Sequence, residues 1–191
     1  MEALLLVDIQ KDYFPGGNMP LVGADEAAAK AASVLAAFRG AGLPVIHVRH
    51  EAARPGATFF LPGTTGTEIH PAVAPLPGEA VVLKHFPNSF RETGLGFLLD
   101  EGRIERLTVC GMMTHMCVDA GVRAAMDLGL SCSVVHDACA TRNLEFEGVA
   151  APAAQVQAAF LAALFAAGAG MAPAAEVART IGASVGPAPT N

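Results

Sequence analysis

The feature that most constrains the fold is a series of short, almost wholly apolar runs that alternate with longer helical patterns. Five runs are candidate strands: residues 3–7, 44–48, 80–83, 107–110 and 131–135. They lack the polar–apolar alternation of a half-exposed strand, so they predict a parallel sheet covered by helices on both faces. We therefore expect an α/β sandwich, in which residues 169–172 supply a weak sixth strand.

The segments between these runs predict three helices and one long loop. Apolar residues recur at helical spacing behind Asp25, a candidate N-cap, and again over residues 114–129 and 152–167. Residues 51–78 are rich in Pro and Gly around Phe59-Phe60, and a loop of this length in a compact domain is usually a lid or a binding loop. We expect one domain over residues 1–183 and a flexible tail over 184–191.

Composition excludes several classes of function. The chain is 52% hydrophobic, and twelve basic against eighteen acidic residues give a net charge of -6. No basic run that would neutralise phosphates is present, so nucleic acid is not expected as a partner. No stretch resembles a membrane span or a signal peptide, so we expect a cytoplasmic protein that does not bind membranes. The four cysteines lack CxxC spacing and are expected to be free thiols.

Polar residues that directly follow the apolar runs mark the candidate site, because ligands bind outside the carboxyl ends of parallel strands. The five positions are Asp8, residues 47–50, Lys84, residues 111–117 and His136-Asp137. A carboxylate, an ammonium and a thiol at one sheet edge are the groups that a cysteine nucleophile needs. The carboxylate takes the thiol proton, while the cation and a helix N-terminus are expected to lower the pKa of the thiol.

Three segments resemble the signature segments of the isochorismatase-like cysteine hydrolases. They are residues 7–14 (VDIQKDYF), 84–90 (KHFPNSF) and 110–118 (CGMMTHMCV). The resemblance covers residues 3–170 and implies a Rossmann-like three-layer α/β/α sandwich with six parallel strands in the order 3-2-1-4-5-6. It also implies a catalytic triad of Asp8, Lys84 and Cys117, and a homo-oligomer, either a dimer or a tetramer. Finally, it implies a cis peptide bond between Met112 and Met113 and an oxyanion hole formed by the backbone N–H groups of Met113 and Cys117.

The family includes enzymes with different reactions, and differences between this sequence and their motifs indicate which reaction to expect. Isochorismatases proper resemble the family but have a residue other than cysteine at the nucleophile position. The presence of Cys117 therefore favours attack on a carbonyl carbon. Nicotinamidases carry an Asp-x-His metal motif after the second strand, whereas residues 47–52 read HVRHEA, so neither a metal nor another cofactor is expected. We therefore expect hydrolysis of a small amide, ureido or lactam substrate through an acyl-enzyme on Cys117. Residues 111–118 resemble the streptothricin hydrolases most closely.

Other functions stay open on the same fold. They are a nicotinamidase-like or isochorismatase-like hydrolase, a redox-active thiol protein, and a non-catalytic binder of small molecules. The sequence does not identify the substrate.

Candidate residues for the substrate pocket are aromatic and histidine side chains near the three segments: Phe14, Phe59, His85, Phe90 and His115. Packing in the core is an equal alternative for each phenylalanine. Residues i and i+2 diverge on a helix, so His115 is not expected to act as a base for Cys117. Gln10 and Asn88 are expected to fix the catalytic loops by hydrogen bonds, and Asp137 to order loops near its strand.

Overall fold

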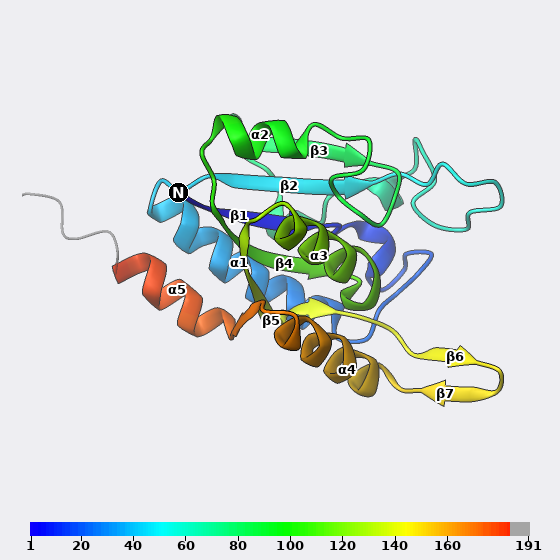
Figure 1. Cartoon of the computed structure of the whole chain (residues 1–191). Helices are drawn as coiled ribbons and strands as arrows, with labels where there is room; N and C mark the ends of the chain where they lie inside the picture. Colours follow the sequence, from blue (N-terminus) through cyan, green and yellow to red (C-terminus); the bar gives the residue numbers. More distant parts are fainter. Residues whose placement is uncertain (184–191) are drawn as a thin grey trace, which may run out of the picture.

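A central sheet of six parallel strands organises the computed structural model, which describes residues 1–183 (Figure 1). The strand order is β3-β2-β1-β4-β5-β8, so the predicted fold class and order are confirmed. The weak run near residue 170 supplies the sixth strand, and the expected tail, residues 184–191, lies outside the described residues. The strands are β1 Glu2–Val7, β2 Val45–His50, β3 Ala80–Lys84, β4 Arg106–Met112, β5 Ser131–Ala140 and β8 Gly170–Ala172.

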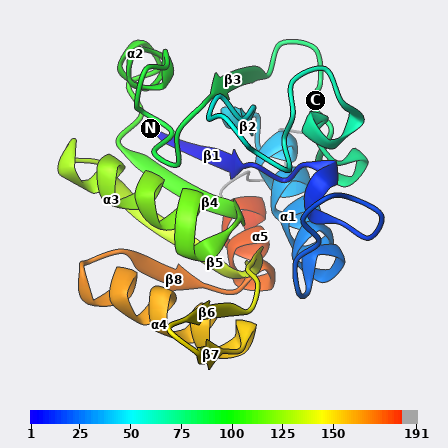
Figure 2. The same ribbon diagram turned by 90° about the vertical axis from the view of Figure 1, so that its right-hand side faces the viewer.

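Helices cover both faces of this sheet (Figure 2). One face packs against α1 Ala24–Gly40 and α5 Ala174–Ala183, and the other against α2 Leu95–Glu101, α3 Asp119–Asp127 and α4 Ala153–Ala166. Alternate residues of β1 belong to the two hydrophobic cores: Leu4 and Leu6 to the first, Leu5 and Val7 to the second. Because both faces are buried, the whole strand must be apolar, which explains the uninterrupted run in the sequence.

The helices differ from the expectation in three respects. Helix α1 is capped by Gly23 at a φ of 74° rather than by Asp25, which lies in the first turn. The segment expected as one helix over 114–129 begins with a π-helical turn, Thr114–Val118, before α3. Helices α2 and α5 and the hairpin of β6 Leu144–Phe146 and β7 Val149–Ala151 were not predicted. No helix within residues 1–183 is long and apolar enough to cross a membrane.

The side chain of Gln10 ties three segments together at the carboxyl edge of the sheet. Its amide nitrogen donates to the carbonyl oxygens of His50 at 2.9 Å and Thr67 at 2.8 Å, and its oxygen accepts from the His50 N–H at 2.7 Å. Gln10 is fully buried, so these bonds replace those that water would make. The end of β2 and the loop that follows it are thereby held against the segment after β1.

A glycine permits the close approach of β4 to the end of β1. Gly111 pairs with Val7 in the sheet at a φ of 151°, a conformation that L side chains rarely adopt. A Cβ atom at this position would lie 2.2 Å from the Val7 carbonyl oxygen. The chain can therefore run from β4 into the turn that carries Cys117 directly beside Asp8.

Replacing Gln10 by leucine should destabilise the fold. Gln10→Leu removes the partner of the His50 N–H and of the carbonyls of His50 and Thr67, at a cost of about 1–3 kcal/mol for each group that is left buried. Urea denaturation should show a lower midpoint with an unchanged slope. The control is Gln155→Leu on the exposed side of α4, and equal midpoints for the two variants would contradict this role of Gln10.

Candidate active site

The structure brings together the three residues of the expected triad. Asp8 directly follows β1, Lys84 ends β3, and Cys117 lies in the π-helical turn after β4. The Lys84 ammonium nitrogen is 2.6 Å from Asp8 Oδ2 and 3.2 Å from Cys117 Sγ. Asp8 and Lys84 are 0% exposed and Cys117 is 5% exposed. A carboxylate, an ammonium and a thiol thus form a buried cluster at the sheet edge.

The turn that carries Cys117 begins with an unusual peptide bond. The bond between Met112 and Met113 is cis, at the position that the family resemblance implies. Met113 and Cys117 both line the cavity described below.

The thiol of Cys117 is not acidified in the resting protein. Burial raises its pKa above the usual value, the negative charge of Asp8 raises it further, and Lys84 opposes both only in part. The expectation of a lowered pKa is therefore wrong. The physical reason is that the thiol is buried, and that the carboxylate of Asp8, which is paired with Lys84, counteracts the effect of the ammonium on the sulfur.

Lys84 itself keeps its proton. Burial alone would lower the pKa of Lys84, but the charge of Asp8 and the hydrogen bonds of the cluster outweigh burial and raise it. The resting site thus holds a protonated Lys84 and a neutral Cys117 thiol beside Asp8. Asp8 Oδ1 has no hydrogen-bond partner among residues 1–183, so one carboxylate oxygen is free to accept a proton.

The backbone at Asp8 is held in an uncommon conformation. Its φ is 50°, in the left-handed region that few residues other than glycine adopt. Its N–H donates to the Val48 carbonyl at 3.0 Å, and its carbonyl accepts from the Gln10 N–H at 2.9 Å. Such strain persists where the surroundings fix it, and here it directs the carboxylate toward Lys84 and Cys117.

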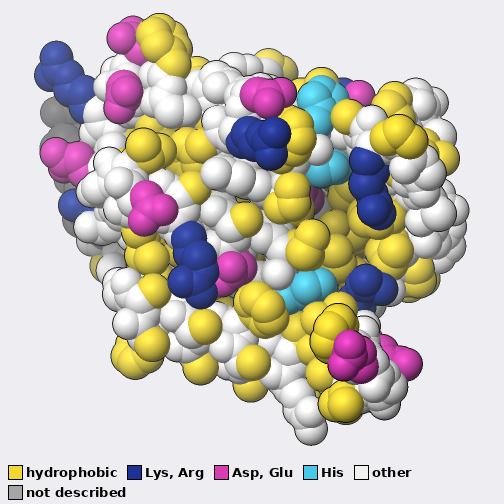
Figure 3. Space-filling view, turned by 45° about the vertical axis from the view of Figure 1, so that its right-hand side comes forward, with side chains coloured by type: hydrophobic (Ala, Val, Ile, Leu, Met, Phe, Trp, Pro, Cys, Tyr) yellow, Lys and Arg dark blue, Asp and Glu magenta, His cyan; other side chains and the backbone are white. Residues whose placement is uncertain are grey.

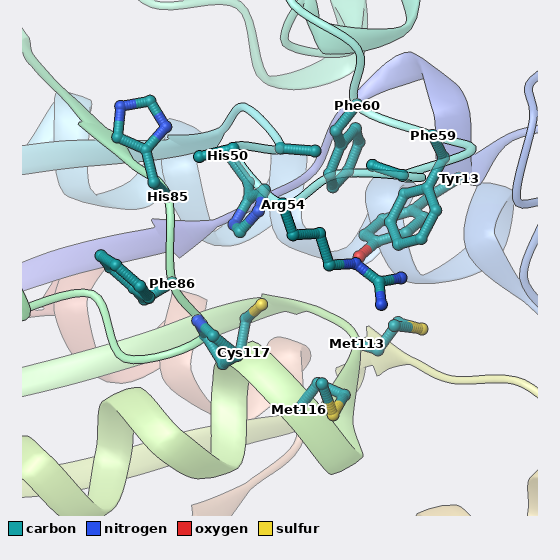
Figure 4. A pocket seen from close by; sticks show the side chains of 14 residues that line it. Tyr13, His50, Arg54, Phe59, Phe60, His85, Phe86, Met113, Met116 and Cys117 are labelled. Carbon is teal, nitrogen blue, oxygen red and sulfur yellow. The ribbon is translucent and has the colours of Figure 1, made fainter.

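A cavity of about 520 Å³ opens in front of Cys117, and Figure 3 shows a hollow with mainly hydrophobic side chains on this part of the surface. Met113, Met116 and Cys117 lie on one side of it, and the rings of Tyr13, Phe59 and Phe60 on another (Figure 4). Arg54 reaches across between them. The remaining lining residues are His50, Ala52, Ala53, Ala57, His85, Phe86 and Pro87. The wall of the cavity is therefore mainly apolar.

Two of the five residues expected in the pocket line this cavity, namely Phe59 and His85. Phe14 lies elsewhere, because its ring stacks on His70 at a centroid distance of 3.8 Å. Phe90 packs against the core between the sheet and helices α2 to α4. His115 is turned away because its Nδ1 is 2.5 Å from the Thr141 hydroxyl.

Several residues that line the cavity were not predicted from the sequence. A signal existed for His50, since it ends the second apolar run, and for Tyr13 and Phe86, since they lie in the signature segments. Arg54 and Phe60 come from the irregular loop after β2, where no periodicity indicates which side chains turn inward.

The cluster contains groups of the kinds that bind metal ions. Asp8, His50 and Cys117 each place one potential ligand atom within 4.8 Å of the others. However, the Lys84 ammonium contacts all three, at 2.6 Å from Asp8, 3.0 Å from His50 and 3.2 Å from Cys117. The position of a cation among these groups is therefore taken by the ammonium, and the site does not fit a metal ion while Lys84 stays in place.

The Isochorismatase domain model matches residues 2–174 of the chain. The protein belongs to the isochorismatase family of hydrolases. It is 51% identical over 162 residues to the uncharacterized isochorismatase family protein YddQ of Bacillus subtilis. The aligned region covers 85% of this chain and 90% of that protein. It is 40% identical over 151 residues to a streptothricin hydrolase of Streptomyces noursei, covering 75% of this chain but only 51% of that enzyme.

Solved structures of the isochorismatase family share the whole architecture. The crystal structure of an isochorismatase hydrolase from Oleispira antarctica superposes with a TM-score of 0.90 at 56% sequence identity, covering 93% of this chain and 96% of that one. The six-stranded fold described above is thus the isochorismatase fold.

The ion pair should contribute strongly to the stability of this family member. Lys84→Met leaves the Asp8 carboxylate buried without its partner, which should lower the free energy of unfolding by about 3–5 kcal/mol. Asp8→Asn combined with Lys84→Met removes both charges and should recover most of that loss, as measured by urea denaturation.

A matched control for the ion pair is Arg123→Met, which breaks the more exposed contact between Arg123 and Asp119 at 3.0 Å. That change should cost less than about 1 kcal/mol. A double variant as unstable as Lys84→Met alone would contradict the stabilising role of the pair.

The raised pKa of Cys117 predicts how its alkylation depends on pH. Cys117 should react with iodoacetamide before the other cysteines, because it faces the cavity. The rate should still increase above about pH 8.5, the usual pKa of a cysteine thiol. Peptide mapping across a pH series measures both. Burial raises the pKa of Cys132 to about 11 and of Cys139 to about 12, and neither lines the cavity. A rate that levels off below pH 8 would indicate a preformed thiolate.

Proposed function

We propose that the protein hydrolyses a carbon–nitrogen bond other than a peptide bond in a small amide, ureido or lactam substrate. The observation that carries this proposal is the contact of one ammonium with both Asp8 and Cys117, at the wall of a cavity. This arrangement supplies a nucleophile, a proton acceptor and a charge that stabilises both. The 40% identity to a streptothricin hydrolase supports the same class of reaction.

The first half of the reaction forms an acyl-enzyme. Cys117 Sγ attacks the substrate carbonyl carbon as its proton passes to Asp8, and the C–S bond forms. The backbone N–H groups of Met113 and Cys117 stabilise the negative charge that develops on the carbonyl oxygen. Asp8 then donates the proton to the substrate nitrogen, the C–N bond breaks, and the amine leaves.

The second half releases the acid. Asp8 accepts a proton from a water molecule that attacks the thioester carbonyl. The C–S bond breaks, the sulfur regains the proton, and the site returns to its resting charges. Lys84 remains an ammonium throughout and stabilises negative charge on whichever of Asp8 and Cys117 carries it.

The raised pKa of the Cys117 thiol fits this sequence of proton transfers. A neutral thiol beside a free carboxylate oxygen loses its proton as it attacks, so no thiolate accumulates without substrate. A redox-active thiol needs a lowered pKa instead, because peroxide reacts with the thiolate. The electrostatics therefore favour hydrolysis over redox chemistry.

The cavity also limits the class of substrate. A volume of about 520 Å³ suits a small molecule, and the apolar wall favours an apolar or aromatic acyl group. Among the lining residues, Arg54 carries the one permanent charge.

Removal of the nucleophile should abolish turnover. Cys117→Ala and Asp8→Asn should each lower kcat by about 1000-fold or more, because one loses the covalent step and the other both proton transfers. Release of ammonia or amine from a panel of small amides, ureido compounds and lactams measures this. Mass spectrometry of the rapidly quenched wild-type reaction should show the acyl group on the Cys117 peptide.

Cys132→Ala serves as the control, because Cys132 is a buried thiol outside the cavity, and it should keep wild-type turnover. If Cys117→Ala hydrolysed the same amide at the wild-type rate, the covalent mechanism would be excluded.

A further inference from the structure

His50 ends β2 and lies between the triad and the cavity. It is half-buried and lines the cavity wall, and its ring is 5.7 Å from that of Phe60 (Figure 4). Its Nδ1 atom is 3.0 Å from the Lys84 ammonium nitrogen. The mechanism above assigns no task to this side chain.

The contact with Lys84 determines which nitrogen of the ring carries the proton. An ammonium group has only donors, so Nδ1 must accept and must be unprotonated. The remaining proton of a neutral imidazole then lies on Nε2. Burial and the charge of Lys84 lower the pKa of His50 to about 4, so the ring is neutral at physiological pH.

The Nε2–H group of His50 has no partner in the described part of the protein. No hydrogen bond joins it to residues 1–183, and it is not among the enclosed polar atoms that lack a partner. It is therefore accessible from the cavity. One ring nitrogen of His50 also lies within 4.8 Å of Cys117 Sγ, so the imidazole ring is close to the sulfur.

We propose that His50 is a fixed hydrogen-bond donor to the substrate, which Lys84 holds in the Nε2–H form. The Nε2–H group binds an acceptor atom of the substrate next to the scissile bond, such as a carbonyl oxygen or a ring nitrogen. This assignment rests on the proposed function for the identity of the substrate. His50 transfers no proton; it selects and orients molecules that present an acceptor.

The tautomer can be tested without any substrate. In ¹⁵N NMR spectra of the intact protein, His50 Nδ1 should resonate as an unprotonated ring nitrogen and Nε2 as a protonated one. His85 is an internal control in the same cavity, because its Nδ1 lies 2.8 Å from the Glu51 carbonyl and must donate, which gives the opposite pattern. A protonated Nδ1 on His50 would overturn the proposal.

Donation into the cavity can be tested with a covalent probe. Alkylation of Cys117 by iodoacetamide attaches an amide carbonyl to the sulfur. The His50 Nε2–H proton should then shift to lower field as it binds this oxygen, whereas the resonances of His136, which does not line the cavity, should stay in place. An unchanged His50 signal would count against donation, whether or not any amide is hydrolysed.

Three variants separate the contact with Lys84 from the contact with substrate. In His50→Asn the side-chain oxygen replaces Nδ1 as an acceptor for Lys84 but no donor reaches the cavity. In His50→Gln the longer side chain places its NH₂ group near the position of Nε2. His50→Leu removes both functions and should lower kcat/KM by about 10–100-fold.

The proposal expects His50→Gln to recover most of the activity lost in His50→Leu, and His50→Asn to recover little. Greater recovery in His50→Asn than in His50→Gln would show that His50 acts only by holding Lys84, and would overturn the proposal. His136→Leu is the matched control and should keep the wild-type kcat/KM. If no amide is hydrolysed, the proposed function fails, while the NMR experiments still decide the role of His50.

Discussion

The buried ion pair between Asp8 and Lys84 is the interaction on which the site depends. Both side chains are fully buried and their charged atoms are 2.6 Å apart, so neither charge is compensated by water. Removing two ions from water costs several kcal/mol each, and only close contact together with further hydrogen bonds offsets that cost. Lys84 finds such partners in His50 at 3.0 Å and in the Phe86 carbonyl at 3.1 Å. Since β2 lies between β1 and β3, the pair spans the end of the middle strand and requires the 3-2-1 order of the sheet.

Burial and the pairing of these two charges together determine the protonation state of Cys117. A free ammonium 3.2 Å from the sulfur would favour a thiolate, but this ammonium is paired, and the pKa of Cys117 is raised by its burial. Asp8 Oδ1 lies beside this pair without a hydrogen-bond partner among residues 1–183. The neutral thiol is thus mainly a consequence of burial, and the Asp8 carboxylate counteracts the effect of the ammonium.

The fold, and the meeting of Asp8, Lys84 and Cys117 at one sheet edge, could be predicted from the sequence because both leave local signals. Uninterrupted apolar runs indicate a sheet that is buried on both faces. The residue after each run lies at the carboxyl edge of the sheet, where ligands bind. The cavity wall was less predictable. Tyr13 and Phe14 are neighbours in one signature segment, yet Tyr13 faces the cavity and Phe14 stacks on His70, because the short turn Lys11–Tyr13 has no period that assigns a side. The pKa of Cys117 was mispredicted for a similar reason: the sequence shows neither how deeply the thiol is buried nor which two charged groups pair.

The loop after β2 connects the buried cluster to the wall of the cavity. Its base is held by buried polar groups: Asp12 accepts a hydrogen bond from the Phe60 N–H, and the Phe60 carbonyl accepts one from the Ala52 N–H at 2.8 Å. Its tip, which includes Arg54, is exposed and has no such anchors among the described residues. The anchored base of the loop and the tip that contributes Arg54 to the cavity wall are therefore separated along one segment. Substitutions at the exposed tip should therefore leave the contact between Lys84 and Asp8 undisturbed, so the cavity wall can vary while the buried cluster stays fixed.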